Sequence, residues 1–286
     1  LCNSLDVSSD QRTAVLGGCT QKCLGGTVEL SGGLSSGGVG GTVVVAGGAT
    51  RSTDSQGRGG NVEVRGGSSN AGEGGSVILL TGKSDGATSG ARSMRTEDSG
   101  PAGASGSVIG DTGKATGGAG GSMTLTVGEG DTGNGGAMTL TAGKTTETSA
   151  VGGAVTITAG EADDSSSGGT GGAMTLTAGA GAATGGAVTI TTGLGTAASS
   201  GTMTLATAAG GSAGNSGSMS LVTGDSTTAG ATGNVSITTG EATGGNGGDI
   251  KLEVGDGDTG NGGAMTLTAG KTTETSAVGG AVTITA

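Results

Sequence analysis

A six-residue segment in which apolar and polar side chains alternate, bounded by glycines, recurs along this chain. In the unit GGAMTLTAG at 135–143, Met138 and Leu140 alternate with Thr139 and Thr141. A period of two predicts an extended strand with the apolar pair on one face and the threonines on the other. Thr, Val and Ile favour strands, whereas the frequent glycines disfavour helix.

The first large apolar residue of this segment returns every 14 to 19 residues, except for one interval of 31 between Val77 and Val108. That interval holds two repeats, and the second is degenerate, over 84–105 around Met94. The starting positions are Val28, Val43, Val62, Val77, Val108, Met123, Met138, Val155, Met174, Val188, Met203, Met219, Val235, Ile250, Met265 and Val282.

One repeat alone cannot offset the entropy of ordering its own backbone, because it buries only two aliphatic side chains. Stacked repeats share hydrogen bonds and a continuous core. We therefore expect an all-β fold, a β-solenoid of about seventeen rungs with a repeat near 16 residues. In such a coil Leu140 and Ile157 are buried, and the flanking glycines form turns with positive φ. The alternative is an antiparallel meander with long polar loops.

The sequence divides into a cysteine-containing segment at 1–24 and a repeat array at 25–286. The first segment reads as the edge of a preceding module or as a cap, and we expect the array to continue beyond 286. The blocks 127–159 and 254–286 are identical over 33 positions, except that Glu129 corresponds to Asp256. The array therefore grew by duplication of blocks, which is typical of a fibrous product.

Composition narrows the possible functions. The chain has 72 Gly, no His and no aromatic residue, and its net charge is −11. Phosphate neutralisation and base stacking are therefore disfavoured, and so is binding to an anionic membrane. The apolar runs are too short to span a bilayer. No general acid–base pair is visible, so we expect neither an enzyme nor a bound cofactor.

Two loop motifs resemble ligand sites. Gly-Lys-Ser/Thr occurs at 82–84, 143–145 and 270–272, but the preceding glycine of a phosphate loop is missing and no helix is expected to follow. The run at 128–136 resembles a calcium-binding β-roll without its nine-residue period. Solvated turns are the simpler interpretation of both, and no metal site is predicted.

The candidates for covalent modification are few. Cys2, Cys19 and Cys23 are disulfide candidates for an oxidising compartment; a zinc site made by them would be one ligand short, and free thiols are the remaining possibility. Asn234 begins the sequon Asn-Val-Ser and is an N-glycosylation candidate. Ser and Thr in the spacers are expected to carry O-linked glycans.

Threonines form a TxT array along the repeats, with two interpretations. One is an open ice-binding face, because TxT on a β-solenoid resembles insect and bacterial antifreeze proteins. The other, which we favour, is a strand face covered by other protein, because charged residues interrupt the array at Lys251 and Glu253. The array comprises Thr124, Thr126, Thr139, Thr141, Thr156, Thr158, Thr175, Thr177, Thr189, Thr191, Thr266, Thr268, Thr283 and Thr285.

The units GGAMTLTAG and GGAVTITAG, separated by Ser/Thr/Gly-rich spacers, resemble glycine-rich repeat proteins of stramenopile cell surfaces, in diatoms, brown algae and oomycetes. The resemblance implies an extracellular glycoprotein, with the tubular flagellar hair (mastigoneme) as one setting. The expected function is a structural rod segment of an extracellular filament or surface appendage, assembled with other chains and with glycans. The alternative is an ice-binding or adhesive module that uses the TxT array.

Overall fold

The computed structural model describes residues 28–53, 57–162, 168–227 and 230–285. Within these ranges it contains no helix and no strand, only extended segments joined by turns and bends. The predicted β-solenoid is therefore wrong. The apolar segments are extended, as their period of two requires, but they do not pair into a sheet.

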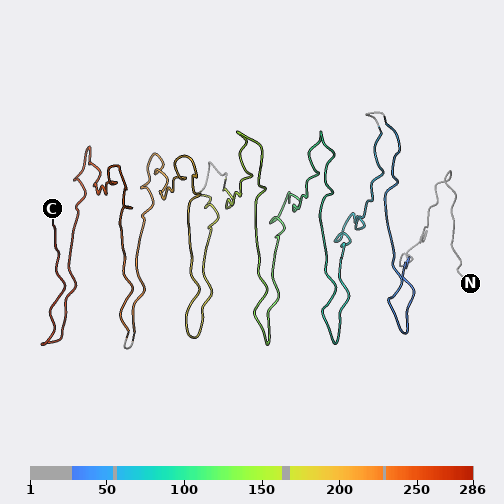
Figure 1. The fold of residues 1–286 in the computed structure, drawn as a ribbon, viewed down its shortest axis with the longest axis horizontal. Coiled ribbons are helices and arrows are strands. Elements are labelled where there is room, and N and C mark those ends of the chain that lie inside the picture. Colours follow the sequence, from blue (N-terminus) through green and yellow to red (C-terminus); the bar gives the residue numbers. More distant parts are fainter. Residues whose placement is uncertain (1–27, 54–56, 163–167, 228–229, 286) are drawn as a thin grey trace, which may run out of the picture. The chain divides into compact units, whose positions relative to one another are not determined.

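The chain divides into two units, Leu1–Leu140 and Thr141–Ala286. Within each unit, extended arms alternate with reversals of the chain (Figure 1). An arm corresponds to one alternating apolar segment, and a reversal corresponds to one Gly/Ser/Thr-rich spacer. The chain reverses direction at some spacers and continues onward at others (Figure 1), and the arms pair into strands at neither.

Many of the spacers are closed by one backbone hydrogen bond between glycines, which we call a neck. The N–H of the glycine that precedes an arm donates to the carbonyl of the glycine that ends the arm before it. Ten necks occur among the described residues, with N···O distances of 2.7 to 3.2 Å. Their acceptor and donor glycines are Gly33 and Gly41, Gly48 and Gly60, Gly67 and Gly75, Gly82 and Gly90, Gly128 and Gly136, Gly143 and Gly153, Gly160 and Gly172, Gly179 and Gly186, Gly193 and Gly201, and Gly270 and Gly280.

The necks explain why the chain does not coil. A solenoid rung needs a polar leg that returns the chain so that the next strand runs parallel to the last. Here the spacer closes on itself after seven residues, from Gly179 to Gly186, or after as many as twelve, from Gly160 to Gly172. No strand forms on either side of the spacers in the described residues, so no rung stacks in register on its neighbour.

At some necks, close approach of the backbone requires glycine at particular positions. At the neck between Gly67 and Gly75, a Cβ on Gly66 would lie 1.9 Å from the carbonyl oxygen of Gly75, and a Cβ on Gly75 would lie 2.8 Å from the nitrogen of Gly67. The glycines expected to form positive-φ turns beside the arms do not do so. Among the described glycines only Gly168 and Gly244 have positive φ, and both lie inside loops.

The described residues have no buried side chain, apolar or polar. Leu140 and Ile157, expected in the core, are 68% and 70% exposed. The whole chain has 27,953 Å² of accessible surface, whereas a compact protein of 25.8 kDa would have about 10,000 Å². The burial predicted from the alternating pattern is therefore wrong for the single chain, because antiparallel arms that meet only at their necks cover little of one another.

Two loop hydrogen bonds recur in both copies of the duplicated block. In 144–150 the hydroxyl of Thr145 accepts a hydrogen bond from the Glu147 N–H at 3.1 Å, and the Ala150 N–H donates to the Glu147 carbonyl at 3.4 Å. In 271–277, which has the same sequence, the equivalent bonds measure 3.2 and 3.4 Å. The same two hydrogen bonds thus form 127 positions apart, but the copies differ elsewhere. Ser149 has a φ of 70°, whereas its counterpart Ser276 has no positive φ, and the neck of Gly128 and Gly136 does not recur at Gly255 and Gly263.

Candidate functional site: the arms and their loops

The TxT threonines lie on the arms and every one of them is exposed. The neck bonds set their register. Counting away from Gly160 and Gly172 along the two arms, Ile157 reaches the same position as Thr175, and Thr158 the same position as Met174.

The same interleaving follows from the neck between Gly128 and Gly136, where Leu125 takes the position opposite Thr139. These arms form no sheet in the described residues, so the threonines of one arm and the aliphatic residues of the next do not share a paired face.

Among the described residues, four ion pairs join side chains two positions apart, and three of these pairs lie on arms. Glu63 pairs with Arg65, Arg95 with Glu97 at 3.3 Å, and Lys251 with Glu253. All six side chains are largely exposed, so each pair contributes little to stability. Their significance is that each of these arms has one positive and one negative side chain on the same face. Of these residues, the sequence pattern identified Lys251 and Glu253 as interruptions of the TxT array.

The Gly-Lys-Ser motif at 82–84 forms a closed loop. Lys83 pairs with Asp85 in the fourth ion pair, at 2.5 Å, and the Ser84 hydroxyl accepts a hydrogen bond from the Ala87 N–H at 3.0 Å. No helix follows the motif. The lysine and the hydroxyl are thus engaged in local turn contacts, which is the solvated-turn interpretation.

The described part of the chain holds no group of three or more Cys, Asp or Glu side chains placed to bind a metal ion. It also contains no helix long and apolar enough to cross a membrane. The disulfide candidates Cys2, Cys19 and Cys23 lie outside the described residues. Asn234 follows Gly233 at the start of an arm and is exposed, so its side chain is accessible to a glycosyltransferase.

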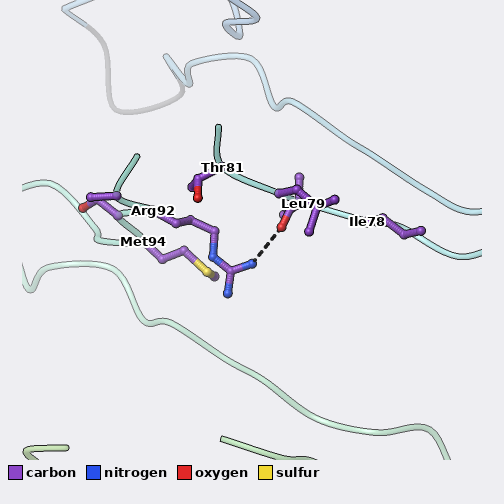
Figure 2. Close-up of a pocket in the computed structure, with 8 residues that line it drawn as sticks. Ile78, Leu79, Thr81, Arg92 and Met94 are labelled. Carbon is purple, nitrogen blue, oxygen red and sulfur yellow. Dashed lines mark hydrogen bonds between the residues drawn. The ribbon is translucent and has the colours of Figure 1, made fainter. Parts of the chain in front are cut away.

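The sequence did not reveal the cavity shown in Figure 2. It has a volume of about 450 Å³ and lies between the arms on either side of the neck of Gly82 and Gly90, lined by Ile78–Thr81 and Ala91–Met94. The Arg92 guanidinium donates to the carbonyl of Leu79 at 3.5 Å, which is the one interaction drawn across it. The cavity is the space between two arms that diverge after their neck. In the sequence, the feature that could have indicated this cavity is the spacing between Gly82 and Gly90.

A search for similar proteins returned no match among protein-family models, curated proteins or solved structures.

Proposed function

We propose that this chain is a non-enzymatic structural segment of an extracellular filament or cell-surface appendage, and that it assembles with other protein chains. The observation that carries the proposal is the exposure of its aliphatic side chains: every large hydrophobic residue described lies at the surface. Soluble monomers rarely expose extensive apolar surface, and where they do the surface marks an interaction site.

The amount of surface supports assembly with several neighbours. A stable protein–protein interface buries about 1,200 to 2,000 Å² in total. The accessible surface of this chain exceeds that of a compact protein of its mass by roughly 17,000 Å². The exposed surface is therefore large enough for contacts with several chains at once.

The backbone supports the same function. Between described residues, the backbone hydrogen bonds are the ten necks and four short turns, whereas a folded domain has about one internal hydrogen bond per residue. The N–H and C=O groups of the arms are open to another extended chain, as in edge-to-edge strand addition. Repetition of one arm sequence gives many equivalent sites, which suits a filament.

The ice-binding alternative requires an uninterrupted TxT lattice on one face. The arms that carry the threonines do not pair into a sheet in the described residues, so the TxT pairs form no continuous flat lattice in the single chain. This geometry favours packing against protein. The resemblance of the repeats to stramenopile surface proteins supports an extracellular, glycosylated setting, with a mastigoneme as the specific hypothesis.

Electron microscopy of the native material tests this function. We expect filaments that an antibody against the loop sequence KTTETSA, present at 144–150 and 271–277, decorates along their length. Pre-incubation of the antibody with that peptide is the control. Native protein found only as dispersed single chains would contradict the proposal.

A further inference from the structure

Two arms, one in each unit, carry opposite charges on either side of an aliphatic residue. In the first, Glu63 and Arg65 flank Val64; in the second, Lys251 and Glu253 flank Leu252. Each charged pair is bonded within its own arm and exposed to solvent.

Neighbouring arms of the same chain do not supply counter-charges to the first arm. Counting from the neck of Gly48 and Gly60, Glu63 lies opposite Val45; counting from the neck of Gly67 and Gly75, it lies opposite Leu79. Arg65 likewise faces valines on both sides by the same count. Among the described residues, neither charge forms an ion pair with another arm.

A second copy of the chain supplies the counter-charges. If two copies of the first arm lie antiparallel about Val64, then Glu63 of each copy faces Arg65 of the other. In a parallel arrangement in register, each charge would face its like, which is unfavourable across paired strands. The charge order thus selects an antiparallel partner of identical sequence.

The second arm is more completely self-complementary. Antiparallel pairing about Leu252 sets Lys251 of each copy against Glu253 of the other, and Ile250 against Val254. The five positions 250–254 thus match opposite charges with each other and aliphatic residues with each other. In this contact the open backbone groups and the aliphatic side chains give affinity, and the charges fix orientation and register.

We propose that copies of this chain associate through two self-complementary arms, 62–65 and 250–254, each pairing antiparallel with the same arm of another copy. This inference rests on the proposed filament function and names the partner. Each contact has two-fold symmetry and closes between two copies. Because the two arms are different, a copy joined through one still presents the other, so growth is open-ended.

The third charged arm does not meet the same description. Arg95 and Glu97 flank Thr96, not an aliphatic residue, and Asp98 follows directly. Pairing about Thr96 would place no apolar side chains together at the two-fold axis. We therefore assign association to the first two arms only.

The test uses the full 286-residue chain under reducing conditions, so that its cysteines cannot join copies covalently. The disrupting variants are Glu63→Arg and Glu253→Lys, which put like charges on both positions of one arm. The matched controls exchange the charges: Glu63→Arg with Arg65→Glu, and Lys251→Glu with Glu253→Lys. Each control changes two side chains, whereas each disrupting variant changes one. The controls nevertheless keep the arm self-complementary.

Sedimentation velocity over a range of concentrations is the readout. We expect open-ended growth of the unaltered chain and of both exchanged controls. Each disrupting variant should stop at dimers, with the blocked contact weakened about tenfold or more, and the combination of both should stay monomeric. A mixture of the Glu63→Arg and Arg65→Glu chains should recover the blocked contact.

The inference is overturned if the disrupting variants grow like the unaltered chain, or if the exchanged controls fail as the disrupting variants do. Either result alongside labelled native filaments would leave the filament function standing and assign its contacts to a different chain. Loss of native filaments from the micrographs would remove the proposed function itself. The two failures are therefore distinguishable.

Discussion

A methyl group placed on Gly66, next to a neck, should have the opposite effect to one placed on the neck glycine Gly67. This comparison tests the most regular feature of the structure. The neck between Gly67 and Gly75 has an N···O distance of 2.7 Å. A Cβ on Gly66 would fall 1.9 Å from the Gly75 oxygen, and because the obstructing atom belongs to the backbone it cannot rotate away. Gly66→Ala should therefore open the neck.

Gly67→Ala is the matched control. Nothing lies within 4 Å of a Cβ at this position, and the residue is not among those with positive φ. Alanine there restricts the open chain and should stabilise the closed neck by about 0.4 to 1 kcal/mol. Two adjacent glycines of one neck thus have opposite expected effects.

The assay is hydrogen exchange at the Gly75 amide. A net hydrogen-bond contribution of about 0.5 to 1.5 kcal/mol corresponds to a protection of about two- to tenfold. Gly66→Ala should abolish that protection, and Gly67→Ala should raise it about two- to fivefold. Unchanged protection in Gly66→Ala, or its loss in Gly67→Ala, would refute the close-approach explanation of the necks.

Three further outcomes follow from the exposure of the arms. Leu140→Asp should change the stability of the single chain by less than about 0.5 kcal/mol and leave neck protection intact, since Leu140 is 68% exposed; loss of protection at several necks would reveal a core. The isolated chain should show no thermal hysteresis, and a hysteresis gap abolished by Thr139→Tyr would instead establish ice binding. Mass spectrometry of native protein should find glycans on spacer Ser and Thr, and the exposed Asn234 is open to an N-glycan; bare spacers throughout would contradict an extracellular glycoprotein.

The sequence located the elements but not their arrangement. The alternation of Met138, Thr139, Leu140 and Thr141 defines one arm whichever way the next arm runs, because a period of two is the same in parallel and antiparallel order. Direction is set by how the spacer closes, and here that depends on a hydrogen bond between glycines seven to twelve positions apart. Glycine content alone does not distinguish such a neck from a solenoid corner.

The sequence likewise predicted only part of the candidate site. The TxT threonines are exposed on their arms, but the sheet expected to gather them on one face does not form in the described residues. The alternating charges at Glu63 and Arg65 were visible in the sequence as an interruption. Their self-complementarity became meaningful only once the necks showed that the neighbouring arms offer no counter-charge.

The most direct test of the account follows strand content and particle size together, by far-ultraviolet circular dichroism and sedimentation on the same samples. In the described residues of the single chain, the arms are extended and unpaired. We propose that they pair only between chains. Strand signal should therefore be low in dilute monomer and rise with concentration as the particles grow. A full strand signal in the dilute monomer, or particle growth without any gain in strand signal, would contradict it.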